Sequence, residues 1–514
     1  MKISSFRATN FRGFLDTSHI ALKPINLLIG KNSIGKSSFA RLWPIFAQGA
    51  KLQKRTPILW NGDLVDFGTF KNVLSRHSTS NEIGFEFLME VETRDILPST
   101  RIARPGTRVR HLREGQFGFK ITLTREINDP ARTRCTGFRI NGDGFEIKYI
   151  FDANGSLTEA VCNGIIAKPV SSHIQQNSIG FLLPLTEYFT TVSDAIVLSY
   201  SPQYLRLQVF LRQQLHQRLS SEKIRDISLR INAIGTPEEL LAYCESLPFE
   251  YKTWKDFLST AREHPHLLRM FHGYATLAAS ENFVRDIDFS LRQHFSAVNY
   301  LRPLRAIAQR YYRKQELAVD NIDSEGANLA FFLESLPASQ LVKLNLWLRE
   351  TIDVEIVLDG EEGHVMINLH DFSTGRSDNI ADMGFGFSQV LPLAVQAWLS
   401  SSPHARVVGR VANDYAILVW EQPELHLHPA MQRKLARLIA KTVMLKKGIS
   451  FIIETHSQSI INEFGDLILA EEFKSEDVQA LLFSQNDGAE TIITSTGYDN
   501  DGQLIDWPLG FLAI

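Results

Sequence analysis

A loop bounded by two glycines carries the residues of this sequence that are best suited to bind phosphate. The loop follows the apolar run Ile25–Ile29 and precedes a predicted amphipathic helix. Glycines let successive backbone N–H groups face one centre, where anions bind. A chance match to this spacing is expected about once in a hundred chains of this length, so we expect a nucleotide there. The residues expected around its phosphates are Gly30, Asn32, Ser33, Ile34, Gly35, Lys36, Ser37 and Ser38.

Two residues of this loop have side chains with defined chemistry. Lys36 would reach the β- and γ-phosphates, and Ser37 would place its hydroxyl on Mg²⁺. Two later apolar runs also end in polar residues. The run Ala416–Trp420 is followed by Glu421-Gln-Pro-Glu424, and Gly448–Ile453 by Glu454-Thr-His456. Ligands of α/β sheets bind at the carboxyl ends of strands, so these side chains are candidates for the same site.

A third segment, Met383–Gln389, places two glycines and a serine at the start of a predicted helix. Gly384 and Gly386 would allow close backbone approach, and Ser388 could donate a hydrogen bond to a γ-phosphate. Taken alone the segment is a weak indicator, because helices commonly begin with glycine and serine as simple caps.

The elements that must position these residues predict an α/β protein in three parts. Residues 1–160 are expected to form an N-terminal lobe with the phosphate loop and an antiparallel sheet, because alternating apolar runs surround a hairpin signal at Asn141–Gly144. Residues 161–299 are expected to be a mainly helical insertion, since their apolar residues recur at helical spacing. Residues 300–514 return to strands and carry the other candidate residues.

Composition narrows the class of protein. The chain has 514 residues, 44% of them hydrophobic and 22% charged, with a net charge of −3. This balance gives no general sign of nucleic-acid binding. Three scattered cysteines without metal spacing are typical of a reducing compartment. The N-terminus lacks the hydrophobic region of a signal peptide, and no apolar run reaches about eighteen residues, so we expect a cytoplasmic protein with no membrane partner.

Taken in order, the phosphate loop, the Gly/Ser segment, the acidic strand end, a His-Pro turn and a strand-end histidine resemble ABC-type ATPases of the SMC/RecF-like branch. The matches cover both ends of the chain, whereas the middle third has no counterpart. Asn10-Phe11-Arg12, before the loop, is also typical of the branch. The resemblance implies an ABC-type P-loop ATPase core that binds ATP and Mg²⁺, with Arg12 near the nucleotide.

The resemblance also implies roles for the strand-end residues. Glu421 would hold Mg²⁺ together with Ser37, and His456 would sense the γ-phosphate. The plainer alternatives are a solvated loop acid and a structural histidine. A signature box made of Gly384, Gly386, Ser388 and Gln389 would contact the nucleotide of the opposite subunit. We therefore expect a homodimer or higher homo-oligomer with ATP at the interface.

One residue departs from the pattern of these ATPases. The position after the metal acid usually holds a glutamate that polarises the attacking water, but here it is Gln422. Glutamine can orient water but cannot accept its proton. Glu424 could serve instead, and a loop acid without a catalytic role is an equal alternative. Slow hydrolysis is therefore expected, with ATP acting mainly as a dimer clamp.

The C-terminal stretch Asp501–Phe511 resembles a Trp-Pro-x-Gly-Phe box of a bacterial family of AAA-type ATPases. Many such proteins are similar to the ATPase subunits of antiphage systems such as Septu, PARIS and the OLD/Gabija group. That resemblance implies a sensor or scaffold that controls a separate effector, a nuclease acting in trans. For Trp507 and Phe511 themselves we prefer a simpler role as a hydrophobic plug.

Two other functions remain open from the sequence. A local basic stretch could meet DNA, RNA or an acidic protein, although a solvated charged loop is the commoner outcome. With Asn10-Phe11-Arg12, this stretch favours a RecF-like DNA-binding repair ATPase as the first alternative. The second is a nucleotide-gated assembly module in which Gln422 has abolished turnover. The basic stretch consists of Arg101, Arg104, Arg108, Arg110 and Arg113.

Overall fold

The computed structural model describes residues 2–91, 115–127, 129, 132–168, 174–192, 195–198, 201–215, 219–232, 234–314, 319–360, 363–402, 415–486 and 490–505. The chain divides into two compact units, each built from several segments. Unit 1 comprises Met1–Ala21, Gly49–Asn61 and Phe67–His294, and unit 2 comprises Leu22–Gln48, Gly62–Asp66 and Phe295–Ile514.

Unit 1 contains a nine-stranded antiparallel sheet in the order β10-β9-β8-β7-β6-β5-β1-β2, with β3 also paired to β1. Side chains alternate between buried and exposed along its strands, as in β8, because one face is covered. The predicted hairpin signal at Asn141–Gly144 forms the turn between β7 and β8. The strands are β1 (Lys2–Phe11), β2 (Phe14–Asp16), β3 (Ile20–Ala21), β5 (Ile83–Val91), β6 (Gly115–Arg125), β7 (Thr133–Gly142), β8 (Phe145–Phe151), β9 (Leu157–Cys162) and β10 (Ile165–Ala167).

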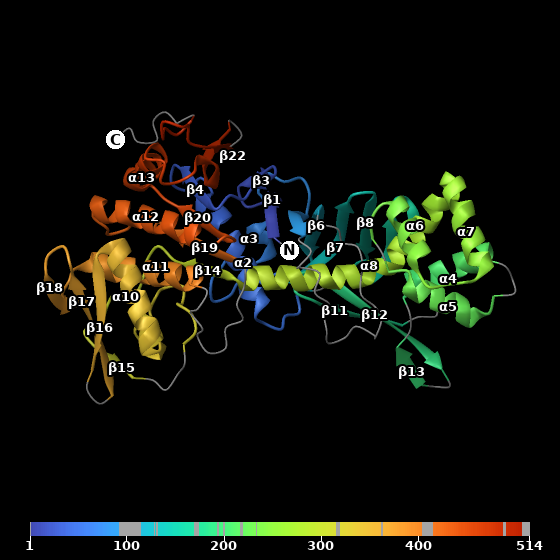
Figure 1. Ribbon diagram of the computed structural model, residues 1–514, viewed down its shortest axis with the longest axis horizontal. Helices are drawn as coiled ribbons and strands as arrows, with labels where there is room; N and C mark the ends of the chain where they lie inside the picture. Colours follow the sequence, from blue (N-terminus) through green and yellow to red (C-terminus); the bar gives the residue numbers. More distant parts are fainter. Residues whose placement is uncertain are drawn as a thin grey trace. The chain divides into compact units, whose positions relative to one another are not determined.

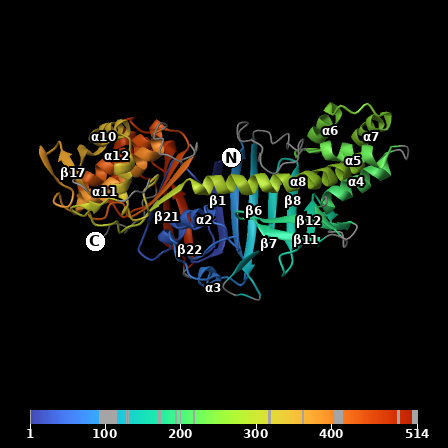
Figure 2. The same ribbon diagram turned by 90° about the horizontal axis from the view of Figure 1, so that it is seen from below.

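A long helix, α8 (Pro265–Ser296), runs across the strands of this sheet (Figure 2). Phe283 packs its ring against Phe117 and Phe145, with centroids 5.5 and 6.2 Å away. Asp288, one turn further on, accepts three consecutive backbone N–H groups from Phe181–Leu183 at 2.6, 2.7 and 2.9 Å. The helix therefore joins the sheet to the smaller β11-β12-β13 sheet: β11 (Ile174–Ile179), β12 (Pro184–Val192) and β13 (Ala195–Leu198).

Shorter helices pack on the first half of α8 and form a separate apolar core. Three of them begin with hydroxyl caps, since Ser201, Ser220 and Thr236 each accept a backbone N–H of the first turn. The aromatic rings of Phe210, Phe257 and other residues fill the centre of this core. The helices are α4 (Pro202–Gln214), α5 (Ser221–Arg230), α6 (Pro237–Ser246) and α7 (Lys252–Glu263).

Unit 2 is built on a six-stranded sheet in the order β14-β19-β20-β4-β21-β22, parallel except for the last pair. Its central strands are apolar throughout and buried, as expected for a parallel sheet. β20 lies between β19 and β4, so Glu421 pairs with Glu454, and Glu454 with Leu28. The strands are β14 (Val298–Leu301), β19 (Ala416–Glu421), β20 (Ile449–Glu454), β4 (Ile25–Gly30), β21 (Val478–Gln485) and β22 (Thr491–Thr496).

Helices and a second small sheet complete the core of unit 2 (Figure 1). Trp420 of β19 donates its indole N–H to the Gln396 amide oxygen of α11 at 2.7 Å, which ties that helix to the sheet. The small sheet contains β15 (Tyr312–Arg313), β17 (His364–Asp371), β16 (Val354–Asp359) and β18 (Arg376–Asn379). The helices are α1 (Lys36–Ala40), α2 (Leu42–Ala50, which continues into unit 1), α9 (Leu329–Ser335), α10 (Ala338–Ile352), α11 (Phe385–Ser401), α12 (Pro429–Leu445) and α13 (Gln458–Leu469). Unit 1 also holds the short α3 (Phe70–Val73).

The mixed α/β fold expected from the sequence, with a P-loop core, an antiparallel sheet and a helical subdomain, is thus confirmed. Within the described part of the chain, no helix has the length and apolar character needed to cross a membrane.

Candidate functional site

The phosphate loop connects β4 to α1 and has backbone geometry that only particular residues allow. A Cβ atom on Gly30 would lie 2.7 Å from the carbonyl oxygen of Phe483, so no larger residue fits there without movement. Gly35 has a φ of +108°, in the region that favours glycine. The Thr491 hydroxyl donates to the carbonyl of Ile34 at 2.9 Å. The loop is thereby held between β4 and the start of β22.

Lys36 lies with its side chain folded into this loop and is 2% exposed. Its ammonium donates to the carbonyl oxygens of Gly30 and Lys31, at 2.8 and 2.6 Å. Burial lowers the pKa of Lys36, while the nearby charges of Glu454 and Glu424 act in the opposite direction. The loop thus contains a buried ammonium group whose position two carbonyls fix, and such a cation suits a phosphate anion.

Glu454, at the end of β20, is the acid that the structure brings to Ser37. The Ser37 hydroxyl donates to Glu454 Oε1 at 2.9 Å, and the glutamate is 4% exposed. Burial raises the pKa of Glu454, and the neighbouring Glu421 raises it further, whereas Ser37, Lys36 and Arg41 lower it. The sequence pattern places Glu454 among the strand-end candidates but assigns it no defined chemical role. The available signal was its place directly after an apolar strand, the same place that Glu421 has.

Glu421, the expected metal acid, lies at the end of β19 and is 1% exposed. Both of its oxygens pair with Arg41, which lies between α1 and α2: Nε contacts Oε1 and Nη2 contacts Oε2, each at 2.7 Å. Tyr300 of β14 also donates its hydroxyl to Oε1, at 2.6 Å. The bonds to Glu421 raise the pKa of Arg41, and burial raises the pKa of Tyr300. Glu421 therefore anchors the phosphate-loop helix to the sheet.

The segment after β19 brings two further candidates to the same edge. Gln422 has a φ of +43°, unusual for a residue other than glycine, and its N–H donates to the Glu454 carbonyl at 2.7 Å. Such backbone strain is often found at functional sites. Glu424 accepts the backbone N–H of His456 on Oε1 at 2.7 Å. Burial raises the pKa of Glu424, and burial together with the charge of Lys36 lowers the pKa of His456.

The expected signature box begins α11, and its residues differ in accessibility. Gly384 is exposed, and Gly386 is half-buried with ordinary van der Waals room for a Cβ atom. Ser388 is buried, and its hydroxyl donates to the Phe385 carbonyl of its own helix at 2.7 Å. Gln389 lies next to it, with Nε2 3.4 Å from the Ser388 oxygen. In this arrangement the glycines, and not the serine hydroxyl, form the accessible part of the box.

Arg305 connects the box to the acidic strand end. Its carbonyl accepts a long bond of 3.5 Å from Gln389 Nε2, and its Nη2 donates to the Pro423 carbonyl at 3.3 Å. Burial lowers the pKa of Arg305 to about 10, while Glu424 acts to raise it. Arg305 thus contacts both Gln389 of the box and Pro423, the residue before Glu424.

The described part of the chain does not bring every residue singled out from the sequence to this site. Arg12 belongs to unit 1, where its guanidinium lies 5.1 Å from the Phe67 ring centre and donates to the Asn72 carbonyl at 3.2 Å. The basic stretch and the C-terminal Trp507 and Phe511 fall outside the described residues. The basic stretch consists of Arg101, Arg104, Arg108, Arg110 and Arg113.

A divalent cation would find hard oxygen ligands at this site. Ser37 Oγ and Glu454 Oε1 lie side by side, and Glu454 Oε2 is a buried oxygen without a hydrogen-bond partner among the described residues. Mg²⁺ prefers such oxygen donors and usually keeps waters in its remaining positions. In the parts of the chain that the structure describes, no group of three or more His, Cys, Asp or Glu forms a complete metal cage. The residues fit a cation that is bound jointly with phosphate.

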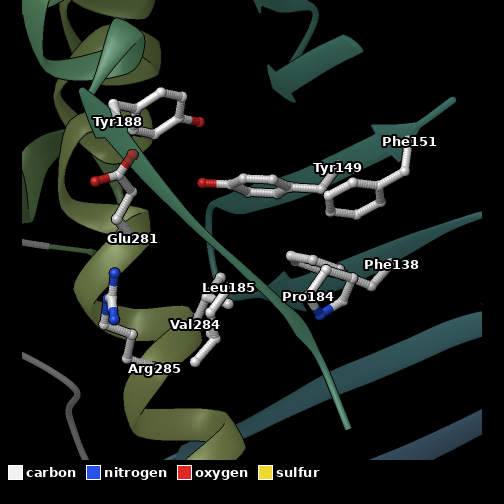
Figure 3. Close-up of a pocket in the computed structure, with 9 residues that line it drawn as sticks. All are labelled: Phe138, Tyr149, Phe151, Pro184, Leu185, Tyr188, Glu281, Val284 and Arg285. Atoms are coloured by element: carbon white, nitrogen blue, oxygen red, sulfur yellow. The ribbon is translucent and has the colours of Figure 1, made fainter. Parts of the chain in front are cut away.

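Unit 1 contains a separate small cavity of about 30 Å³ between β8, β12 and α8. Tyr149, Tyr188 and Glu281 all line this cavity, and the Tyr149 hydroxyl points toward Glu281 (Figure 3). Ligand pockets are usually several hundred Å³ in volume, so this cavity is far too small for a nucleotide.

Two segments of the chain match family models of ATPase domains. Residues 1–129 match the family described as AAA ATPase domain, and residues 257–462 match the family described as AAA domain, putative AbiEii toxin, Type IV TA system. No curated protein matches the chain. These two segments of the chain are thus similar to AAA-type ATPase domains.

Among solved structures, the chain is similar to an SMC head bound to the C-terminal winged-helix domain of ScpA (10% identity, 97% of this chain and 98% of that one, TM-score 0.34). It is also similar to an Smc head with an extended coiled coil bound to the C-terminal domain of ScpA from Pyrococcus furiosus (10%, 96% and 96%, 0.34). A third is the SMC head domain from Thermotoga maritima (9%, 96% and 98%, 0.32). At these TM-scores the similarity supports no inference about function.

Proposed function

We propose that this protein binds ATP with Mg²⁺ at the Gly30–Ser38 loop and hydrolyses it. The observation that carries the proposal is the buried Lys36 ammonium, which two loop carbonyls hold beside Ser37 and Glu454. Phosphate oxygens would take over from those carbonyls as partners of the ammonium, in a loop whose N–H groups suit anions. The AAA ATPase domain match over residues 1–129 includes this loop and supports the same chemistry.

Each residue around the loop would have its own role in ATP hydrolysis. Mg²⁺, when bound, would neutralise charge on the β- and γ-phosphate oxygens. Glu424 would accept the proton of the attacking water on its second oxygen, and Gln422 would orient that water. His456, held through its backbone N–H by Glu424, would contact the γ-phosphate. Arg41 and Glu421 would keep α1 in place during the reaction.

We further propose that two copies of the chain share each ATP. The supporting feature is the exposed start of α11, where Gly384 and Gly386 leave the backbone accessible. Backbone N–H groups at the start of this long helix would suit the γ-phosphate of a nucleotide bound to the partner subunit. In this proposal Ser388 stabilises the first turn of the helix through its bond to the Phe385 carbonyl.

The family description of residues 257–462, which names a putative AbiEii toxin, favours a role in bacterial defence. We propose a sensor or scaffold ATPase that controls a separate effector protein such as a nuclease. A RecF-like DNA-repair ATPase and a nucleotide-gated assembly module are the competing functions. Duplex DNA binding that strengthens with ATP and weakens steeply with salt would favour the repair ATPase.

The decisive experiment on ATP binding is a titration of the full-length protein with a fluorescent ATP analogue. Lys36→Ala should abolish binding, because it removes the buried cation of the loop. The control is Lys31→Ala, which removes an exposed lysine of the same loop and should change affinity by less than about threefold. Equal affinity in the wild type and Lys36→Ala would rule out the loop as the nucleotide site.

A further inference from the structure

Two glutamates end neighbouring strands at the edge of the sheet where the phosphate loop lies. Glu421 ends β19 and Glu454 ends β20, and the two residues are paired in register. Of these two strands, β20 is the one adjacent to β4, the strand that leads into the loop. Strand order therefore puts Glu454 one position nearer to Ser37 than Glu421.

The hydrogen bonds of the two carboxylates also distinguish Glu421 from Glu454. Glu421 is engaged on both oxygens, by Arg41 at 2.7 and 2.7 Å and by Tyr300 at 2.6 Å. To bind a cation it would have to give up these bonds, which neutralise and satisfy a carboxylate that is only 1% exposed. Glu421 is therefore already committed to a structural role.

Glu454, in contrast to Glu421, has one carboxylate oxygen available for a ligand. It is 96% buried, its Oε1 accepts a bond from Ser37, and its Oε2 has no hydrogen-bond partner among the described residues. A buried carboxylate oxygen without a partner is costly unless a ligand satisfies it. Ser37 Oγ and Glu454 Oε1 lie 2.9 Å apart, and adjacent oxygens in an octahedral Mg²⁺ shell with bonds of 2.0–2.1 Å are about 2.9 Å apart.

We propose that Glu454 is the carboxylate that binds the divalent cation of the nucleotide, jointly with Ser37. This inference rests on the proposed nucleotide site. Glu421 is then a positioning residue: through Arg41 it fixes the start of the loop helix, and through Tyr300 it joins β19 to β14. The cation thus binds at the end of β20, the strand next to β4, and the carboxylate at the end of β19 holds α1 in place.

The test uses Mn²⁺ as the probe, because its electron paramagnetic resonance signal reports free and bound metal without any turnover. The full-length protein is saturated with a non-hydrolysable ATP analogue and titrated with Mn²⁺. Glu454→Gln should weaken Mn²⁺ binding by about tenfold or more, while affinity for the analogue in EDTA stays within about threefold. Glu421→Gln should lower the melting temperature and change Mn²⁺ affinity by less than about threefold.

The control for loss of a buried acid is Glu463→Gln on α13, a residue that is 2% exposed and paired with Arg437. It should leave Mn²⁺ affinity unchanged. If Glu454→Gln does not fold, Glu454→Asp keeps the charge but draws the carboxylate back, and it must still weaken Mn²⁺ binding several-fold. Unchanged affinity in the Glu454 variants, or a larger loss in Glu421→Gln, would overturn the assignment. A wild type that does not bind the analogue at all would overturn the proposed function along with it.

Discussion

In the proposed reaction, Glu424 and Gln422 are the two residues whose chemistry would decide how efficiently ATP is hydrolysed. Glu424 is buried, one oxygen is held by the His456 N–H, and the other has no partner among the described residues. Gln422 is half-buried, is held in a strained backbone conformation and has no basic oxygen. This geometry favours Glu424 as the group that accepts the proton of water.

We therefore expect Glu424→Gln to lower single-turnover hydrolysis by about a hundredfold or more, the usual worth of a general base. Gln422→Glu should raise the rate by less than about tenfold, because a base is already present. Both variants should bind the ATP analogue like the wild type, which serves as the internal control. A gain of more than tenfold from Gln422→Glu, with little effect from Glu424→Gln, would show instead that the wild type lacks a base.

At the scale of elements, α8 packs on the sheet of unit 1 and places Glu281 between them. We therefore expect the free energy of unfolding to depend on pH through Glu281. Glu281 projects from α8 toward Tyr149 and Tyr188 (Figure 3). Burial raises the pKa of Glu281 to about 7, although Ser201 and Arg285 act to lower it. The folded chain thus keeps a proton that the unfolded chain releases above its ordinary pKa, near 4.5. The favourable contribution of Glu281 to the free energy of unfolding is fully present below pH 4.5 and is lost as the pH rises through about 7.

Glu281→Gln, which carries no charge at any pH, should remove this loss. The free energy of unfolding of the variant, measured relative to that of the wild type, should be higher at pH 8 than at pH 5. We expect this difference to reach up to about 3 kcal/mol. The measurement is the melting temperature at both pH values, followed by circular dichroism. Glu263→Gln, at an exposed position at the end of α7, is the matched control. Parallel pH dependence in the wild type and Glu281→Gln would contradict the account.

At the scale of the whole molecule, a shared ATP site predicts complementation between two defective chains. Lys36→Ala removes the cation of the loop. Gly386→Arg adds bulk to the accessible part of the box, at a position where a Cβ atom meets only ordinary contacts. Each variant alone should lack turnover. A mixed dimer has one intact site, so an equal mixture should regain roughly a quarter of wild-type turnover.

Gly497→Arg is the matched control, because Gly497 also has open space around it and lies outside the box. It should keep full activity by itself. Normal turnover by Gly386→Arg alone would exclude the box from the site. A mixture that stays inactive, although mixed dimers are detected by mass spectrometry, would contradict two independent shared sites.

The amino-acid sequence by itself determined the local features of this protein. The phosphate loop, the hairpin at Asn141–Gly144 and the apolar strands that end in acids are written in short stretches, because glycine geometry and apolar spacing act over a few residues. The buried role of Lys36 follows from the same short motif. These features were enough to predict the mixed α/β fold with a P-loop core, and they supplied candidate side chains for a nucleotide site.

Only the tertiary structure decided which acid meets the loop. Glu421 and Glu454 end similar apolar runs, and nothing local distinguishes them. Their difference arises because β20 is inserted between β19 and β4, and because Arg41 and Tyr300 reach Glu421 from other elements. The burial of Ser388 likewise depends on how α11 packs. Strand order and side-chain pairing are set by contacts between residues hundreds of positions apart, and no pattern within one segment encodes them.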